Sequence, residues 1–535
     1  MMYKQKNKQR GITLIALIVT IIVLIILAGV SIAMVVGDNG IIMQAQRAKE
    51  ETDLSIRKES STLTDYEDLM EGKFVEIKQT QDTNPGNMEG SGTQNNPYII
   101  NSIEDLVSFA NLVKEGNTFI NQYVQLGISL DFYEDKSYVD LNKKYILNNT
   151  INGYEESENG EKTLKELLTT GQGWLPIGNT IDSDNQNFEG TFEGNNKVIK
   201  NLYMAQSTQE SSVIGLFANN KGIIQNLKVL NAQIEVNGKD DTYIFIGSIC
   251  GNNQGNMINC ETSGKVSMEA NFGLMSGITG RNQGEIIQCK NYTKLQGRTM
   301  YAGGIAAQNL GRIENCANLG EIIEETYGNY TGGITGSSLS SSSSIVSSYN
   351  TGNIYVMTGE SIVLGGIAGQ SQNPITACYN AGNINVEADN VLIRVGGIAG
   401  YYNNILKNSY NWGSINLTGT AEGKMGGIVG ELSQGTVQYC YNEGKLLSSD
   451  TSSSVGGIIG YVPDNTISIT LSDNYYLNNI EKGIGYILND NELYTTVKEN
   501  EMDKDDLLIL LNTDNNLWKN DNDSLNNGYP ILAWQ

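Results

Sequence analysis

The sequence predicts a mainly β protein: a parallel β-helix, or solenoid, of about nine repeats of ~30 residues, carried on an N-terminal transmembrane and stalk α-helix. The first observation is a motif of the form Gly-Gly-Ile-x-Gly that recurs from residue 215 onward. The second is an apolar residue three positions before a Cys or Ser, usually with a glycine four positions after it. The third is an uncharged run of 25 residues near the N-terminus.

The two repeat motifs keep one period along the chain, with spacings of 27 to 33 residues. Each unit consists of short apolar stretches separated by Asn-x-Gly and Gly-Gly, which suits short strands and tight turns and is too broken for helices. A unit of this length cannot bury its own apolar face, so each must stack on its neighbours. The central apolar positions of the first motif are Leu216, Ile249, Ile278, Ile305, Ile334, Ile367, Ile398, Ile428 and Ile458.

The N-terminal elements follow from charge and hydropathy. Residues 1–11 carry four basic side chains and no acidic one, and residues 12–36 are long enough to cross a bilayer as a helix. The basic flank predicts a cytoplasmic N-terminus and an exported C-terminal part, so a plain signal anchor is one interpretation.

The segment KQRGITLIALIVTIIVLIILAGVSI resembles the prepilin-type cleavage and methylation segment of type IV pilins and pseudopilins. The resemblance implies that residues 1–11 are a leader, that a prepilin peptidase cuts between Gly11 and Ile12, and that pilin-like subunits are partners. Ala16 stands where most members of the family carry a glutamate that pairs with a neighbouring subunit. Efficient assembly as a major pilin is therefore not expected.

The remaining chain divides into five parts. Residues 37–77 begin with a Gly-Asp-Asn-Gly turn signal and are predicted to form a stalk helix, and residues 78–96 read as a polar linker. Residues 97–204 are assigned to the N-terminal part or cap of the solenoid, residues 205–480 to the repeats and residues 481–535 to a C-terminal cap.

The stretch GLFANNKGIIQNLKV, residues 215–229, resembles the GLUG-motif repeats of bacterial surface proteins, and the later Gly-Gly-Ile-x-Gly copies resemble degenerate forms of it. GWLPIG at 173–178 is similar to the usual lead-in of such arrays, and NNGYPILAWQ at 526–535 to their terminal cap. The resemblance implies a β-helical surface role and supplies no catalytic residues.

Three sets of repeated side chains carry expectations about packing. Asparagines of the Tyr-Asn-x-Gly element are expected to adopt left-handed turn geometry and to form an amide ladder. Aromatic side chains are expected to pack along a ladder, with stacking on sugars or proteins as the alternative. The cysteine slot also takes serine, so buried free thiols are favoured over a disulfide framework. The asparagines are Asn350, Asn380, Asn411 and Asn442; the aromatics are Tyr349, Tyr379, Tyr401, Tyr402, Tyr410, Trp412 and Tyr441; the six cysteines, five of which occupy the shared slot, are Cys250, Cys260, Cys289, Cys316, Cys378 and Cys440.

Composition excludes several function classes. There are 35 basic and 59 acidic residues, a net charge of -24, so a nucleic-acid partner is not expected. Histidine is absent, which removes imidazole bases and most zinc sites. The adjacent acids Glu324–Glu325 and Asp240–Asp241 are interpreted as solvated loops, and residues 521–528 do not meet the order of a calcium loop. No catalytic residue, metal site or cofactor is predicted.

These observations predict an exported, membrane-anchored pilin-like surface protein, single-pass with a short cytoplasmic N-terminus, whose rod is an adhesion or interaction module and not an enzyme. Its partners would be the membrane, the prepilin peptidase and an extracellular protein or glycan. The first alternative is a minor, tip-located pilin or pseudopilin of a type IV pilus or secretion system. The second is a carbohydrate-active β-helix enzyme.

Overall fold

The computed structural model divides the chain into two units, residues 1–83 and residues 84–535. It describes residues 88–179, 186–239, 241–326, 330–463, 469–477, 480–488, 504–513 and 516–535, all within the second unit. The predicted leader, transmembrane helix and stalk, with the processing residues Gly11 and Ile12, lie outside the described residues. Among the residues that are described, no helix combines the length and apolar character needed to cross a bilayer.

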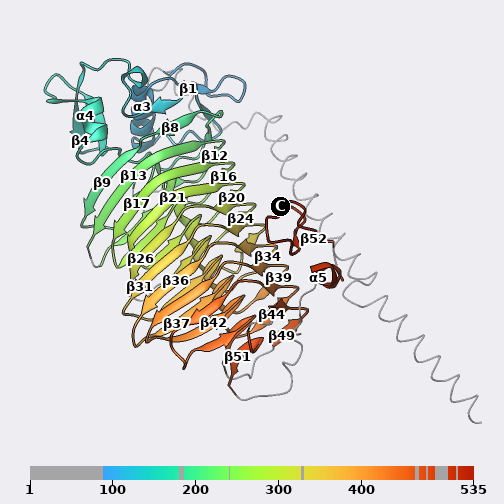
Figure 1. The fold of residues 1–535 in the computed structure, drawn as a ribbon. Coiled ribbons are helices and arrows are strands. Elements are labelled where there is room, and N and C mark those ends of the chain that lie inside the picture. The colour runs from blue at the N-terminus through green and yellow to red at the C-terminus, as the bar shows by residue number, and fades with distance from the viewer. Residues whose placement is uncertain are drawn as a thin grey trace, which may run out of the picture. The chain divides into compact units, whose positions relative to one another are not determined.

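The second unit is a parallel β-solenoid, which confirms the predicted fold of the repeats (Figure 1). In the repeat region each turn supplies one strand to sheets I, II and III and one long or two short strands to sheet IV, with the sheets numbered in chain order. One turn consists of β10 (Ser212–Ile214) in sheet I, β11 (Phe217–Asn220) in sheet II, β12 (Ile223–Gln225) in sheet III and β13 (Lys228–Gly238) in sheet IV. The next turn pairs with it in parallel on every wall.

Sheet III shows that the stack is longer than the predicted nine repeats. It has twelve strands, and its first three are β1 (Tyr98–Ile100), β2 (Tyr123–Leu126) and β7 (Thr191–Glu193), which precede the recognisable motif. Its inward side chains form one aliphatic ladder, with the same position filled by Ile or another apolar residue in each turn. That ladder is Ile224, Met257, Ile286, Ile313, Ile345, Ile375, Leu406, Val437 and Leu471.

Sheets I and II position the candidate site. Sheet I continues from β10 through β14 (Tyr243–Ile246), β18 (Phe272–Ser276), β22 (Tyr301–Gly303), β27 (Tyr330–Gly332), β32 (Ile362–Gly365), β37 (Leu392–Gly396), β42 (Glu422–Gly426) and β47 (Ser454–Gly456). Sheet II continues from β11 through β15 (Cys250–Asn253), β19 (Thr279–Asn282), β23 (Ala306–Asn309), β28 (Thr335–Ser338), β33 (Ala368–Ser371), β38 (Ala399–Tyr402), β43 (Val429–Leu432), β48 (Ile459–Val462) and β51 (Ile484–Ile487).

The Gly-Gly-Ile-x-Gly motif is a packing requirement of the turn between sheets I and II. In the copy at residues 365–369, a Cβ on Gly365 would lie 1.9 Å from the carbonyl oxygen of Ala368, and one on Gly366 would lie 2.1 Å from that of Gly397. Ile367 between them is fully buried in the core. A side chain at either glycine would overlap backbone atoms, so the motif repeats because the turn repeats.

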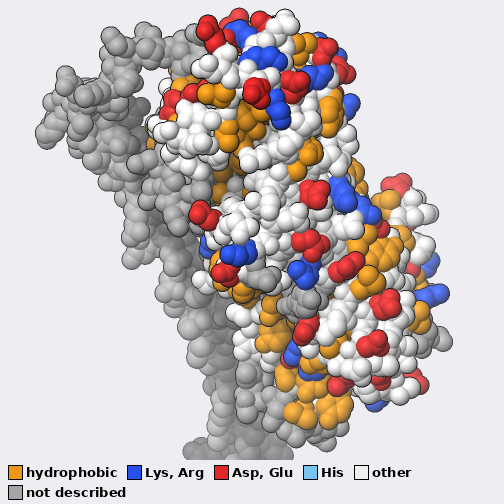
Figure 2. Space-filling view, turned by 90° about the vertical axis from the view of Figure 1, so that its left-hand side faces the viewer, with side chains coloured by type: hydrophobic (Ala, Val, Ile, Leu, Met, Phe, Trp, Pro, Cys, Tyr) orange, Lys and Arg blue, Asp and Glu red, His pale blue; other side chains and the backbone are white. Residues whose placement is uncertain are grey.

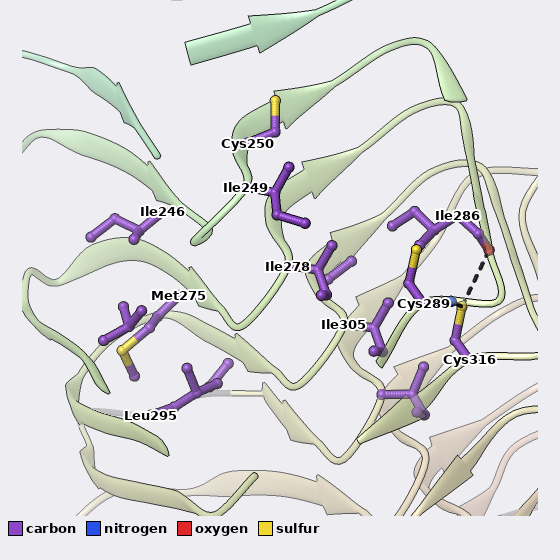
Figure 3. Packing of buried hydrophobic residues seen from close by; sticks show 14 of the residues in the cluster. Ile246, Ile249, Cys250, Met275, Ile278, Ile286, Cys289, Leu295, Ile305 and Cys316 are labelled. Carbon is purple, nitrogen blue, oxygen red and sulfur yellow. Dashed lines mark hydrogen bonds between the residues drawn. The ribbon is translucent and has the colours of Figure 1, made fainter. Parts of the chain in front are cut away.

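The core contains the cysteines, as Figure 3 shows for one group of turns. All six are free and buried, which confirms the preference for buried thiols. In the shared slot the Sγ or Oγ atom accepts the backbone N–H of the preceding turn: the N–H of Cys289 donates to Cys316 Sγ at 3.4 Å and that of Cys316 to Ser348 Oγ at 3.1 Å. Both residue types fit because the slot needs a small side chain that ends in an acceptor.

The expected asparagine ladder is present, but its backbone geometry differs from the prediction. Nδ2 of Asn380 donates to Oδ1 of Asn411 at 2.8 Å and to the carbonyl oxygen of Gly382 at 2.9 Å. The expectation of left-handed geometry at these asparagines is wrong, because the positive φ belongs to the residue just before the Cys or Ser slot, such as Ala377 (φ 55) and Tyr439 (φ 55). The chain bends there, before the asparagine, and the asparagine lies in a strand.

The N-terminal elements cover the first turns. Helix α3 (Ile103–Lys114) begins after Ser102, whose side chain accepts the backbone N–H of Asp105, and it buries Phe109 against Phe192 and Phe217 of the solenoid core. A small antiparallel sheet follows, made of β4 (Lys144–Asn148), β5 (Gly153–Glu156) and β6 (Lys162–Thr163), with helix α4 (Leu164–Thr169).

Candidate ligand-binding corner

Sheets I and II meet at a re-entrant corner on the outside of the solenoid. The outward-facing position of each sheet II strand at this edge is glycine in eight turns and alanine in two. A Cβ on Gly400 would lie 2.4 Å from the carbonyl oxygen of Leu364, and one on Gly460 would lie 2.5 Å from the backbone nitrogen of Met425. Each sheet II strand therefore abuts the sheet I strand of the preceding turn, and the wall bends inward along this line. These small residues are Ala218, Gly251, Gly280, Ala307, Gly336, Gly369, Gly400, Gly430, Gly460 and Gly485.

Two rows of outward side chains flank the corner, one on each sheet. They face each other with an offset of one turn, as the contacts of Arg281 with Phe245 and of Glu431 with Arg394 show. The sheet I row is Val213, Phe245, Leu274, Tyr301, Tyr330, Val363, Arg394, Lys424 and Ser454. The sheet II row is Asn219, Asn252, Arg281, Gln308, Ser337, Gln370, Tyr401, Glu431, Tyr461 and Tyr486.

The N-terminal half of the corner is apolar and aromatic. Phe245 is 7% exposed and Leu274 is 2% exposed, although both point away from the solenoid core, because the re-entrant wall shelters them. They form a separate apolar cluster with Val213 and the partly exposed Tyr301. The Arg281 guanidinium lies 5.9 Å from the centre of the Phe245 ring, and burial lowers the pKa of Arg281 from its ordinary value.

The C-terminal half of the corner is charged and internally paired. Glu431 is only 7% exposed, and its Oε2 atom accepts from Arg394 Nε at 2.6 Å and from Lys424 Nζ at 2.7 Å. Lys424 Nζ also lies 3.6 Å from the centre of the Tyr461 ring, which stacks on Tyr486 with centroids 5.6 Å apart. Every cation of this half therefore has a carboxylate partner within the chain.

Most of the aromatic row that the sequence singled out lies elsewhere, and it packs as a ladder. The rings of Tyr349, Tyr379, Tyr410 and Tyr441 stack 4.9 to 5.0 Å apart with interplanar angles of 3° to 8°. Tyr410 and Tyr441 are almost completely buried, and this burial raises their pKa well above the ordinary value. The interpretation of packing over ligand stacking is confirmed for these residues.

The C-terminal segment, residues 504–513 and 516–535, covers this tyrosine ladder. It contains α5 (Lys504–Leu511), β52 (Trp518–Lys519) and β53 (Ile531–Leu532). The indole N–H of Trp534 donates to the carbonyl oxygen of Ala377 at 3.2 Å, and the hydroxyl of Tyr441 donates to that of Pro530. The face of the solenoid that carries this tyrosine ladder is therefore covered by the C-terminal segment of the same chain.

The other predicted aromatics separate into different environments. Tyr402 is fully buried in the core, where its hydroxyl donates to the carbonyl oxygen of Asn373 at 2.9 Å. Trp412 is partly buried against the C-terminal segment. Only Tyr401 belongs to the corner rows, where its hydroxyl lies 3.1 Å from Ser433 Oγ.

The acidic pairs differ from the sequence interpretation in part. Glu325 is exposed, but Glu324 is fully buried in β26 (Ile322–Thr326), so the interpretation as a solvated loop is wrong for Glu324. Burial raises the pKa of Glu324 to about 8. Asp241 is exposed beside a turn, and Asp240 lies outside the described residues.

Carboxylates also gather at one place on sheet IV that sequence spacing did not indicate. Glu235, Glu269 and Glu325 line a shallow cavity of about 240 Å³ together with Lys265. Figure 2 shows acidic and basic side chains interspersed over one face of the molecule, with no field of a single sign. Within the part of the chain that the structure describes, no group of three or more His, Cys, Asp or Glu side chains is arranged to hold a metal ion.

In the loop at residues 521–528, backbone N–H groups of the loop itself donate to its acidic side chain. The Asp521 carboxylate accepts the backbone N–H groups of Leu525 and Asn526, both at 2.7 Å, and that of Gly528 at 2.9 Å.

Comparisons with known proteins give two partial similarities. No protein-family model matches the chain. The chain is 27% identical over 194 residues to halomucin from Haloquadratum walsbyi, which is 36% of this chain and about 2% of the length of halomucin. It is also similar to a solved structure of a candidate immunoglobulin A1 protease from Bacteroides ovatus, with 18% identity, 83% of this chain and 95% of that chain covered, and a TM-score of 0.35.

The corner rows were missed by sequence reasoning, although one signal pointed to them. The final glycine of each Gly-Gly-Ile-x-Gly copy marks the corner, and the residue after it, such as Arg281 or Tyr401, is the sheet II row. The facing row could not be assigned from spacing, since the offset of one turn is a property of the stacking.

Proposed function

We propose that the chain is a surface-displayed binding module, anchored by residues 12–36 and presenting the re-entrant corner of its solenoid to an extended extracellular ligand. The observation that carries this proposal is the corner itself, which runs over nine turns and combines partly exposed aromatic rings with polar side chains. Concave lines of this kind suit chain-like ligands, because one strand of each sheet recurs about every 4.8 Å along the stack.

Binding is favoured over turnover because of the chemistry of the corner. Its one carboxylate, Glu431, is held by two cations, and no other acid lies in the two rows to act as a proton donor. The carboxylates of the sheet IV cavity lie on a different wall.

The test is retention of the full chain, displayed on cells, by a panel of immobilised polysaccharides and extracellular-matrix proteins. The variant Tyr301→Ala with Tyr330→Ala removes two partly exposed rings from the corner, and we expect it to lose retention at least tenfold. The matched control is Tyr292→Ala with Tyr355→Ala, which removes two exposed rings from sheet IV. Equal retention of both variants would refute the corner as the binding surface.

The N-terminal segment supports a second candidate, a minor pilin or pseudopilin, on sequence alone. Intact-mass analysis of the protein from membranes of its native host tests it. A mature chain that begins at Ile12 and co-purifies with filaments would support this candidate. A chain that begins at Met1 or Met2 would reduce residues 12–36 to a signal anchor.

A further inference from the structure

The N-terminal half of the corner has an unusual charge composition for this protein. The strands of sheets I and II from β10 to β33 contain no Asp or Glu, in a chain with 59 acidic residues. Arg281 is the one charged residue in these twelve strands. The single fixed charge on these twelve strands is therefore positive.

Arg281 is also unsatisfied. Its Nε atom is buried and has no hydrogen-bond partner, and no carboxylate oxygen of the described residues lies within 4.0 Å of the guanidinium. Burying an arginine donor without a partner is costly, and such groups are normally paired. Arg281 as a whole is partly exposed, and its guanidinium carbon lies 5.9 Å from the centre of the Phe245 ring on the facing row.

The C-terminal half of the same corner contains an arginine whose donor is paired with a carboxylate of the chain. There Arg394, on the facing row, donates to the Glu431 carboxylate at 2.6 Å. The outer arginine Arg312 on β24 (Arg312–Glu314) is likewise paired, with Glu314 at 2.6 Å. Both of these arginines are paired with a carboxylate of the chain, whereas Arg281 has no such partner among the described residues.

The surroundings of Arg281 fit a sugar that carries a carboxylate. Two aromatic pairs line sheet I on this half, Tyr243 with Phe272 at 5.2 Å and Tyr301 with Tyr330 at 5.5 Å. Aromatic faces stack on the apolar faces of sugar rings, and the neighbouring Gln308, which is partly exposed, offers an amide that bonds to hydroxyls.

We infer that the N-terminal half of the corner is a subsite for an acidic polysaccharide, in which Arg281 binds the carboxylate of a uronic acid and the aromatic pairs stack on adjacent rings. This inference rests on the proposed function and names its ligand class. Arginine binds a carboxylate through two parallel N–H donors, which a lysine or a glutamine cannot reproduce. The net charge of the whole chain opposes the ligand only weakly, since charges beyond about 8 Å are screened at physiological salt.

The test measures binding of three polymers to the full chain in detergent micelles: polygalacturonate, neutral galactan and polyglutamate. We expect polygalacturonate to bind best, with Arg281→Gln weakening it at least tenfold. The matched control, Arg312→Gln, removes the same charge from an ion pair on sheet III and should change binding less than twofold. Thermal unfolding of both variants checks their folding. If Arg281→Gln is less stable, competition on the unaltered chain replaces it: free galacturonate should displace bound polygalacturonate, and galactose should not.

The outcomes separate this inference from the proposed function. Unchanged polygalacturonate binding by Arg281→Gln, or equal affinity for galactan, would overturn the carboxylate subsite. Preference for polyglutamate would overturn the glycan and indicate an acidic protein ligand. If the Tyr301→Ala, Tyr330→Ala variant loses retention while Arg281→Gln does not, the corner remains a binding surface and only the acidic ligand fails. If neither variant has an effect, both proposals fail.

Discussion

Glu324→Gln tests the energetics of the solenoid core most directly. The Glu324 side chain is fully buried, its Oε2 atom lies 3.1 Å from the hydroxyl of Thr299, and its Oε1 atom has no partner among the residues that the structure describes. Burial raises the pKa of Glu324 from 4.5 to about 8. The folded protein therefore keeps a proton that the unfolded chain releases between these two values, so the stability contributed by Glu324 is fully present below pH 4.5 and falls as pH rises towards 8.

The magnitude follows from proton linkage. Each pH unit in this window costs about 1.4 kcal/mol, or a factor of ten in the opening equilibrium, so the step from pH 5 to pH 7 costs about 3 kcal/mol. Glutamine keeps the shape and the bond to Thr299 but does not titrate. Relative to the unaltered chain, Glu324→Gln should therefore gain about 3 kcal/mol over that step, whatever its offset at pH 5.

Hydrogen exchange of peptides that contain β26 is the suitable assay, because a solenoid can open locally and exchange reports the free energy of that opening. After correction for intrinsic rates, protection of the variant relative to the unaltered chain should rise about a hundredfold between pH 5 and pH 7. Glu325→Gln, at the exposed neighbouring position, is the control and should show no such rise. A flat ratio for Glu324→Gln, or the same slope for the control, would refute the reasoning.

Three further predictions concern the repeated positions. Gly400→Ala should destabilise the solenoid by about 2 kcal/mol, since the added Cβ would lie 2.4 Å from the carbonyl oxygen of Leu364. The control Gly359→Ala, where a Cβ would have nothing within 4 Å, should be close to neutral, and equal melting temperatures of the two variants would contradict this. Asn380→Ala should lower the free energy of unfolding, measured in urea, by about 2 to 4 kcal/mol, because it leaves ladder partners in both neighbouring turns unpaired. An effect as small as that of a surface substitution would contradict the role of the ladder. Cys378→Ser should change the melting temperature little. A thiol reagent should label no cysteine of the native chain but all six after denaturation, because the thiols are buried and burial raises the pKa of Cys378 to about 12. Rapid labelling of the native chain would contradict this.

The repeat period was readable in the sequence because a solenoid places equivalent residues in equivalent environments. Each turn must fill the same core position with an apolar side chain, as Ile367 does, and must make the same bend with glycine. The Cys and Ser slot and the asparagine ladder follow from the same repetition. The error at Asn380 and its equivalents was local: asparagine is common at left-handed positions, but here its amide is needed in a strand and the bend falls three residues earlier, at Ala377.

Contacts that do not repeat were hidden from the sequence. Nothing in the period indicates that Trp534 packs on tyrosines more than 150 residues away, or that Glu324 points inward while its neighbour points outward. Each is decided by a single turn or by a segment outside the array, so no second copy reveals it.

The sequence by itself determined the solenoid, its period, its small and apolar inward positions and the burial of its thiols, because these are imposed on every turn alike. Only the tertiary structure decided which outward rows meet. Arg281 and Phe245 lie 36 residues apart and come together because sheets I and II close on each other with an offset of one turn. That offset depends on how the glycine corner packs in three dimensions, and it is what gathers the aromatic rings and the unpaired arginine on one line.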